Sequence, residues 1–325
     1  MANLLDTTIT GRLGLPVTTQ SGSVNNLWFI NNRLNYSYTG NVFATSGALT
    51  TARCALAGTG TQSATLAFGG ATTVVLSCTE AYNGSTWSTC TGLITARYRL
   101  AGTGISNSAL AIAGDSANPP GFVCSAATEL FNGTSWSTCA SLISARNNLA
   151  GVGTSGATLA IGGEAGALTC VESFNGTSWS TSTALPLGSN LNTAVGTTTA
   201  ALNIAGSPAT YTTQAYNGTT WSQYPGIKVP RRSASSAGCQ NAALLMGGQT
   251  PTIVSCTENY NGGVWFTGGS LITARTCLAG SGTSTTALAF GGATPTLATC
   301  TEKATQGTVV CIFNSGSVIA PPYPY

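Results

Sequence analysis

Six short apolar runs in this chain each end in a pair of small residues, and these pairs recur every 42 to 49 residues. The pairs are Gly69-Gly70, Ala113-Gly114, Gly162-Gly163, Ala205-Gly206, Gly247-Gly248 and Gly291-Gly292. Self-similarity at this period, in segments with a strand-like composition, is typical of a β-propeller, because one four-stranded blade cannot bury its own faces alone. The repeat therefore predicts an all-β fold of six blades.

One unit, taken as an example, contains four strand-like segments. The first two, 149–153 and 157–163, are rich in small or branched apolar residues, with glycines that permit close backbone approach. The last two, 170–174 and 178–182, are joined by Asn175-Gly176, which predicts a type I′ hairpin turn because both residues tolerate a positive φ. The same dipeptide recurs at Asn83-Gly84, Asn132-Gly133, Asn217-Gly218 and Asn261-Gly262.

Three further residue types recur in a fixed order in these units. An arginine stands sixteen residues before the small pair, at Arg53, Arg97, Arg146, Arg231 and Arg275. An aromatic residue precedes the Asn-Gly turn, at Tyr82, Phe131, Phe174, Tyr216 and Tyr260, and a tryptophan follows it, at Trp87, Trp136, Trp179, Trp221 and Trp265. Over residues 35–303 this order resembles the Kelch repeat, although Asn-Gly stands where an aspartate is common in that family. The resemblance implies a six-bladed Kelch-type β-propeller.

The two ends of the repeat region indicate how the ring closes. The sixth unit loses the pattern after Lys303, whereas residues 38–53 align with 82–97 and place Phe43 where Trp87 stands. We therefore expect an N-terminal strand, 36–46, to complete the C-terminal blade, which removes free sheet edges.

The same alignment predicts three parts of the chain. Residues 1–34 form an N-terminal attachment segment, residues 35–313 form the propeller, and residues 314–325 form an extended tail rich in proline and tyrosine. The units of the propeller start near residues 53, 97, 146, 189, 231 and 275.

Charged residues are rare, at 6% of the chain, and most of them follow the repeat. In unit four Gln214 replaces the repeat glutamate, and Ser189 or Asn190 replaces the arginine. Joint loss is expected of a buried pair, because an unpaired buried charge is costly. The predicted structural ion pairs within the blades are Arg53–Glu80, Arg97–Glu129, Arg146–Glu172, Arg231–Glu258 and Arg275–Glu302.

The remaining polar chemistry argues against an enzyme. Asp6, Asp115 and Glu164 are the only other carboxylates, and they lie in the tail and in two different blades, whereas a glycosidase needs two facing carboxylates. The chain has no histidine, which excludes Ser-His and Cys-His nucleophiles and the usual imidazole ligands of zinc or copper. We expect no catalytic residues, no metal site and no cofactor.

Eleven cysteines and several Asn-Gly-Ser/Thr sequences have alternative interpretations. No CxxC spacing is present, and the repeat cysteine position accepts Thr212, so these are small strand residues. The odd count and the lack of a secretory signal at the start favour reduced thiols, with a Cys78–Cys90 cross-strand disulfide as the alternative. The Asn-Gly-Ser/Thr sequences at Asn83, Asn132, Asn175 and Asn217 fit the glycosylation sequon, but the turn already explains them.

Composition also excludes two classes of partner. The net charge of +3 is small and scattered, so no nucleic acid is expected. No apolar run reaches the 18 or more residues of a membrane helix, so no membrane insertion is expected.

Departures from the repeat mark the candidate binding residues. Residues 115–122 form an insertion between the second and third strands of unit two, and several other residues near the repeat arginines are out of register. Binding residues are often found on such loops, although a tolerated insertion is the alternative. The candidates are Tyr98, Arg99, Asp115, Asn118, Phe122 and Arg232.

The chain ends resemble those of virion proteins. Residues 1–14 and 27–40 are similar to N-terminal segments of bacteriophage tail-fibre and other virion proteins, with a TTITG-like stretch ahead of repeated β-structure. This resemblance implies a non-enzymatic virion surface component, assembled in the host cytoplasm, that binds a host glycan or protein receptor through propeller loops. Other virion proteins would bind the N-terminal segment and the tail 318–325 within an oligomeric assembly.

Two alternatives stay open. One is a cellular Kelch protein-interaction scaffold or an adhesin, extracellular or on the cell surface, and the other is a polysaccharide-acting enzyme.

Overall fold

The computed structural model describes residues 9–10, 16–17, 35–38, 40–118, 121, 123–164, 169–207, 211–307 and 309–312. The chain divides into two compact units, Met1–Tyr38 with Thr308–Tyr325, and Thr39–Gly307. In the first unit, β1 (Ile9–Thr10) pairs with β2 (Pro16–Val17), and β3 (Asn35–Tyr38) pairs with β28 (Val309–Ile312).

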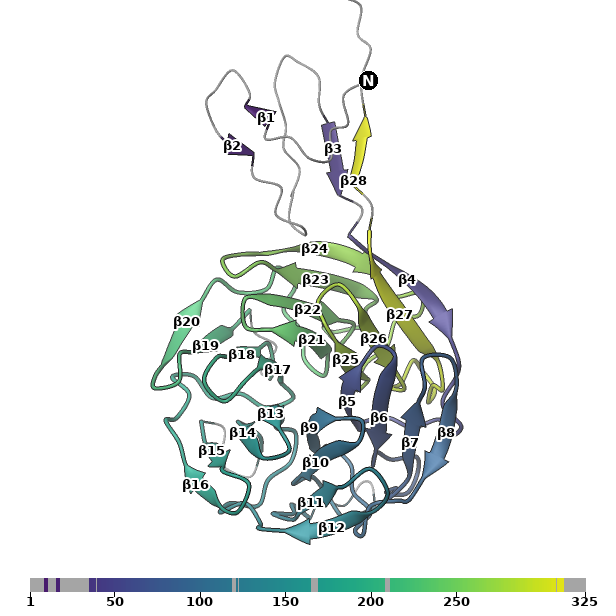
Figure 1. Ribbon diagram of the computed structural model, residues 1–325, viewed down its shortest axis with the longest axis vertical. Helices are drawn as coiled ribbons and strands as arrows, with labels where there is room; N and C mark the ends of the chain where they lie inside the picture. The colour runs from purple at the N-terminus through teal and green to yellow at the C-terminus, as the bar shows by residue number, and fades with distance from the viewer. Residues whose placement is uncertain are drawn as a thin grey trace, which may run out of the picture. The chain divides into compact units, whose positions relative to one another are not determined.

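The second unit is a six-bladed β-propeller, as the repeat predicts (Figure 1). Blade 1 contains β5 (Ala57–Thr61), β6 (Ala64–Phe68), β7 (Thr79–Tyr82) and β8 (Trp87–Cys90). Blade 2 contains β9 (Ala101–Ile105), β10 (Ser108–Ile112), β11 (Thr128–Phe131) and β12 (Trp136–Cys139). Blade 3 contains β13 (Ala150–Thr154), β14 (Ala157–Ile161), β15 (Val171–Phe174) and β16 (Trp179–Thr181). Blades 4 and 5 contain β17 (Thr193–Gly196), β18 (Ala201–Ile204), β19 (Thr213–Tyr216) and β20 (Trp221–Tyr224); β21 (Ser235–Cys239), β22 (Ala242–Met246), β23 (Cys256–Tyr260) and β24 (Trp265–Ser270).

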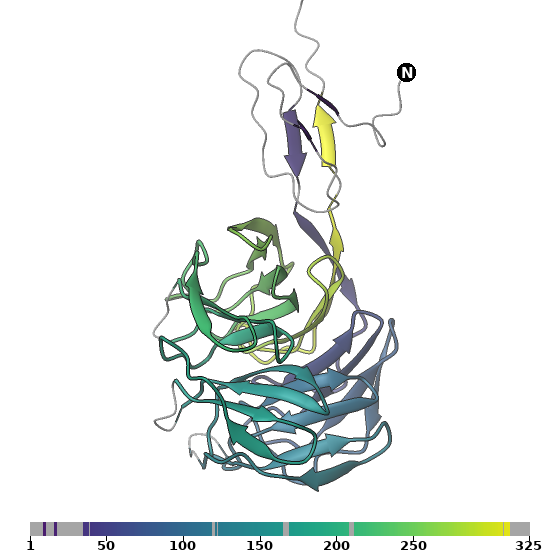
Figure 2. The ribbon, with the colours of Figure 1, turned by 60° about the vertical axis from the view of Figure 1, so that its left-hand side comes forward.

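The sixth blade closes the ring with an N-terminal strand, which confirms that prediction. Its order is β25 (Ala279–Gly282), β26 (Ala287–Phe290), β27 (Thr301–Gln306) and β4 (Asn41–Ser46). In Figures 1 and 2 the purple β4 lies beside the yellow-green β27. Phe43 lies opposite Ala304, at the register position that Trp87 occupies opposite Tyr82 in blade 1.

The closing strand and the propeller unit are both shorter than expected. The pairing of β4 with β27 begins at Asn41, whereas β3 and β28 pair with each other and with no blade. The compact propeller unit, Thr39–Gly307, is therefore narrower than the 35–313 read from the sequence.

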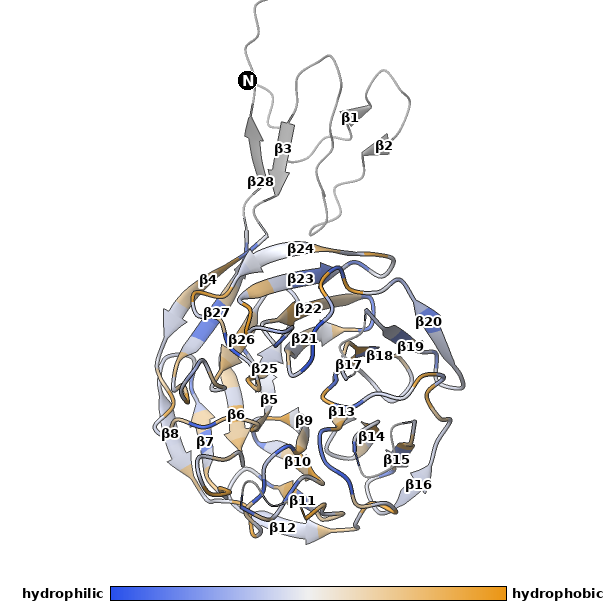
Figure 3. Ribbon diagram, turned by 180° about the vertical axis from the view of Figure 1, so that it is seen from behind, coloured by the Kyte–Doolittle hydropathy of each residue, from blue (hydrophilic) through white to orange (hydrophobic). Residues whose placement is uncertain are grey.

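Each blade buries its second strand on both faces. In β6 and β10 every residue after the first is buried, and the apolar β6 and β26 are orange in Figure 3. Neighbouring blades pack closely because the inner strand carries glycine. A Cβ at Gly58 would lie 2.3 Å from the Phe290 ring of blade 6, too close for any side chain. The alternation of glycine with small residues in the inner strands thus allows aromatic residues to pack between blades.

The repeat tryptophans join neighbouring blades. Trp136 packs on Phe131 of its own blade, with ring centroids 5.1 Å apart, and on Phe68 of blade 1 at 5.0 Å. Its Nε1 donates to Thr79 Oγ1 of blade 1 at 3.1 Å. One side chain therefore supplies both apolar contact and a buried hydrogen bond across the interface.

The Asn-Gly turns differ from the predicted type I′ geometry. Tyr82 pairs with Trp87, so a four-residue loop joins the strands, and only the glycine, Gly84, has a positive φ (95°). Asn83 Oδ1 accepts the N–H groups of Ser85 and Thr86, both at 2.9 Å. The two-residue prediction was wrong because the asparagine side chain caps the loop instead of adopting a left-handed backbone.

The longer loop also sets the register of the cysteines. Cys90 lies opposite Thr79, so the predicted placement of Cys78 opposite Cys90 was wrong by one residue. Adjacent strand positions face opposite sides of a sheet. Both thiols are free.

Candidate functional site at the mouth of the pore

Antiparallel order within each blade gives the propeller two distinct faces. One face carries the connections from each outer strand to the next inner strand, together with the loops between second and third strands; we call it the pore-mouth face. The other carries the short hairpin turns, including the Asn-Gly loops, and we call it the turn face. Loop length and sequence vary on the pore-mouth face, so a site that differs between blades is expected there.

Buried ion pairs support the pore-mouth face. In each pair the arginine is fully buried and lies within 2.9 to 3.2 Å of its glutamate. The glutamate also holds the connection that enters its own blade: Glu129 accepts the N–H groups of Ile94 and Thr95 at 2.7 and 3.1 Å. The pairs therefore fix the connecting loops and are structural.

Blade 4 replaces the ion pair with neutral hydrogen bonds. Gln214 accepts from the N–H of Leu187 and donates to its carbonyl, both at 3.1 Å. Ser189 donates to the Ala205 carbonyl at 3.1 Å, and Asn192 donates to Asn203. Neutral hydrogen bonds thus take the place of both charges in blade 4.

A closed ring of backbone hydrogen bonds surrounds the pore. In each blade the second residue after the arginine position has a positive φ of 50 to 55°, and its N–H donates to the carbonyl of the equivalent residue in the preceding blade, at 2.8 to 2.9 Å. The six residues are Ala55, Arg99, Asn148, Leu191, Ser233 and Cys277. Left-handed backbone costs about 1 kcal/mol or more at a residue other than glycine. The ring of hydrogen bonds offsets that strain and fixes where six side chains point.

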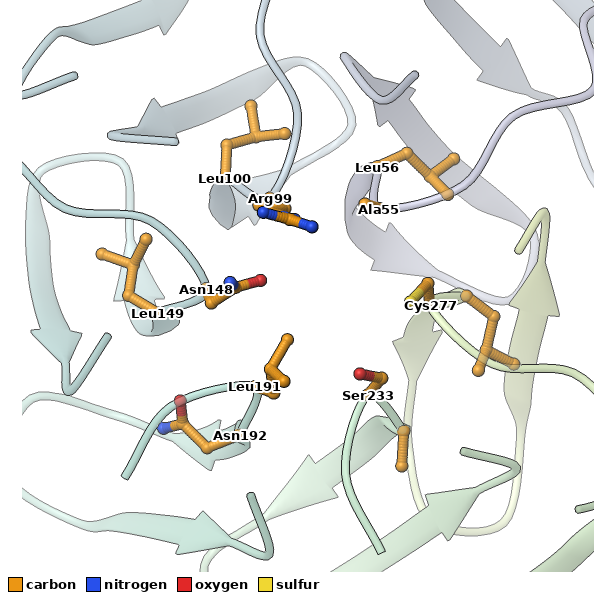
Figure 4. A pocket seen from close by; sticks show the side chains of 12 residues that line it. Ala55, Leu56, Arg99, Leu100, Asn148, Leu149, Leu191, Asn192, Ser233 and Cys277 are labelled. Atoms are coloured by element: carbon orange, nitrogen blue, oxygen red, sulfur yellow. The ribbon is translucent and has the colours of Figure 1, made fainter. Parts of the chain in front are cut away.

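These six residues and the residue after each of them line a cavity of about 90 Å³ (Figure 4). Arg99 is the one charged residue among the lining residues. In Figure 4 the Arg99 guanidinium, the Asn148 amide and the Ser233 hydroxyl reach toward the centre from three blades. The six positions therefore share one backbone conformation but carry side chains of different chemistry.

A buried polar cluster holds Arg99. Its Nη1 lies 3.5 Å from Asp115 Oδ2, and its guanidinium lies over the Tyr98 ring, 4.9 Å from the centroid. Asn147 donates to the same Asp115 oxygen at 2.7 Å, and Asn148 donates to Asn147 Oδ1 at 3.1 Å. Burial raises the pKa of the Tyr98 hydroxyl, while Arg99 opposes that rise. Three blade-2 residues and two blade-3 residues thus form one network.

The structure brings together half of the predicted binding residues. Tyr98, Arg99 and Asp115 are in contact, whereas Asn118 lies farther out, where its Oδ1 accepts the Val75 N–H at 3.0 Å. Arg232 lies in blade 5, across the ring, paired with Gln249. Phe122 lies outside the described residues.

Sequence reasoning missed the contribution of blade 3. Asn147 and Asn148 follow Arg146 as Tyr98 and Arg99 follow Arg97, and that equivalent position was the available signal. Glu164 was considered only as a spare carboxylate; its Oε1 accepts from Asn190 at 3.0 Å. A second polar contact thus links blade 3 with blade 4.

Cysteine reactivity offers a test of this local environment. Burial, together with the smaller effect of the nearby Cys277, raises the pKa of the Cys54 thiol to about 11, whereas Cys239 is exposed. At pH 8 the thiolate fraction of Cys54 is then about a hundredfold below that of an ordinary thiol. We expect iodoacetamide to modify Cys239 rapidly and Cys54 very slowly, as measured by peptide mass spectrometry. Equal rates in the folded protein would contradict the expectation, whereas equal rates in urea serve as the control.

Among the residues that the structure describes, no three histidine, cysteine, aspartate or glutamate side chains gather in a way that would hold a metal ion. Within the same residues no helix has the length and apolar character needed to cross a bilayer.

Comparison with known proteins returns no match, either to a protein-family model or to a curated protein. What the structure shows is therefore a six-bladed β-propeller with a central cavity lined mainly by apolar residues, to which Arg99, Asn148, Asn192 and Ser233 add polar groups.

Proposed function

We propose that this propeller is a non-enzymatic binding module that recognises a receptor through its pore-mouth face. The observation that carries the proposal is the polar network of Arg99, Asp115, Asn147 and Asn148, which residues of blades 2 and 3 add to a ring with a sixfold backbone repeat. Polar groups held by buried neighbours are typical of recognition sites. The propeller fold itself supplies a rigid support and no specific function.

Two carboxylates near the cavity, Asp115 and Glu164, bind neighbouring side chains, which suits a role in positioning those side chains. Asp115 is fully buried against Arg99 and Asn147, and Glu164 accepts from Asn190. A hydrolase would use such groups as acid and base facing a substrate. Their amide and guanidinium partners instead favour a role in positioning side chains.

The rim of the same face is apolar, which favours a second candidate, a protein-interaction scaffold of the Kelch type. Exposed aliphatic side chains lie on five of the connections between blades: Ile94, Ile143, Leu187, Val229 and Ile272. The recurrence of an exposed aliphatic residue on these connections is the observation that favours the scaffold, since exposed apolar surface on one face can be buried by a protein partner.

The ends of two strands agree with a receptor-binding role at a particle surface. β27 ends, and β4 begins, on the turn face of the propeller unit, which is the face opposite the cavity. A virion component attached through its terminal segments would keep the pore-mouth face available. Immunogold labelling of native particles and cells tests this placement, and label confined to cell interiors would contradict it.

Binding of the purified full chain to candidate host cells tests the face itself. We expect Ile94→Asp/Ile143→Asp, which places charge on the rim, to reduce binding at least tenfold. The matched control is Val264→Asp, because Val264 is 51% exposed and lies on the turn face. Equal loss in both variants would contradict a site on the pore-mouth face. Binding to intracellular proteins and not to cell surfaces would favour the scaffold.

A further inference from the structure

We propose that the pore-mouth cavity binds the hydroxyl-bearing edge of a neutral sugar, an inference that rests on the receptor-binding function proposed above. The cavity of about 90 Å³ is several times the space that one bound water molecule needs. It therefore admits a hydroxymethyl group or a pair of adjacent hydroxyls, while the rest of the sugar stays outside.

The donor side of the cavity is Arg99. Its side chain is 28% exposed, and Asp115 and the Tyr98 ring hold the guanidinium in place. Because Asp115 is a buried carboxylate only 3.5 Å from Nη1, the pair brings little net charge to the cavity. Arg99 thus offers directed N–H groups without a strong field for an anion.

The acceptor side is Asn148. Its Nδ2 donates to Asn147 Oδ1, and this bond leaves Oδ1 as the atom that faces the cavity, as Figure 4 shows. Ser233 presents a hydroxyl from the opposite wall, which both donates and accepts. The orientation of the amide is therefore set by a buried neighbour and not by solvent.

A hydroxyl group matches this set of partners better than a carboxylate does. It accepts from Arg99 and donates to Asn148 Oδ1, whereas a carboxylate only accepts and would face Oδ1 and the nearby Asp115 carboxylate. The side chains of Ala55, Leu191 and Cys277 supply apolar wall for the C–H groups of a sugar ring. An apolar wall with a few placed donors and acceptors is typical of small-molecule binding sites.

The ring itself supplies variants that should fold. Leu191 occupies in blade 4 the position of Asn148, with φ values of 50 and 53°, and Ala55 occupies in blade 1 the position of Ser233. Asn148→Leu and Ser233→Ala therefore place residues that this backbone already accepts. Lys228→Gln is the control, since Lys228 is exposed on the same face and does not line the cavity.

Ligand-observed NMR titration of the full chain provides the test. The panel contains the methyl glycosides of galactose, glucose and mannose, N-acetylglucosamine, glucuronic acid and N-acetylneuraminic acid. We expect at least one neutral sugar to bind with a dissociation constant on the order of millimolar. Asn148→Leu should weaken it at least tenfold and Ser233→Ala about threefold, Lys228→Gln should leave it unchanged, and the acidic sugars should bind more weakly.

Three results would overturn the inference: no neutral sugar binds, the acidic sugars bind more tightly, or Asn148→Leu leaves binding unchanged while circular dichroism shows a folded propeller. The cell-binding experiment separates this failure from failure of the proposed function. If the original protein binds cells but no sugar, and Ile94→Asp/Ile143→Asp abolishes the cell binding, the sugar subsite is disproved and the receptor-binding face is retained. Absence of both kinds of binding sinks both proposals.

Discussion

Glu129→Gln is expected to destabilise the propeller by about 3–5 kcal/mol, because it leaves the fully buried Arg97 guanidinium without its carboxylate. Burial already lowers the pKa of Arg97, and Glu129 opposes that shift more strongly than Cys139 does. The free energy of unfolding, measured by urea titration with circular dichroism, gives the loss directly.

Blade 4 supplies the control for this prediction. Gln214 occupies the glutamate position without an arginine partner, so Gln214→Glu should also destabilise, because it buries a carboxylate with no cation. The double variant Arg97→Met/Glu129→Gln should recover at least half of the loss, since neither charge remains buried. Additive losses in the double variant would contradict a structural pair.

Phe43→Ala is expected to cost about 3–5 kcal/mol, because Phe43 is the large apolar residue of the closing strand and is only 8% exposed. It packs in one cluster with Leu244 and Met246 of blade 5 and with Leu278 of blade 6. Truncation should therefore loosen the closing blade first. Hydrogen exchange is expected to show faster exchange in β4 and β27 before any other blade changes.

The neighbouring residue gives the matched control. Val42 is 53% exposed on the same strand, so Val42→Ala should change stability by less than about 0.5 kcal/mol. A similar loss for both variants, or uniform acceleration of exchange across all blades, would contradict ring closure through Phe43.

Several features could be predicted because they recur. The small pairs gave six blades, and the alignment of residues 38–53 with 82–97 gave the closing strand. The pairing of arginine with glutamate could be predicted from unit four, where both disappear together. A repeated burial constraint acts on each unit separately, so it leaves a pattern along the chain.

Local turn geometry was harder to predict from the sequence, because the Asn-Gly dipeptide suits two different turns. Asn-Gly is compatible with a two-residue type I′ turn and with an asparagine-capped four-residue loop. The structure has the second, at Asn83 as at Asn132. That choice also moved Cys90 opposite Thr79 and removed the geometry for a Cys78–Cys90 disulfide.

The sequence alone determined the blades, their order, the buried ion pairs and the strand that closes the ring. Each of these features recurs at the same position of successive units, so it leaves a repeated pattern in the sequence. Only the tertiary structure decided the candidate site. The six pore-lining positions share a backbone conformation and a spacing of two residues from the repeat arginine position, but no residue type, so the sequence does not show that their side chains meet. Closure of the ring brings Arg99 and Asn148 from separate units to one cavity, and a contact of that kind exists only once all six blades are in place.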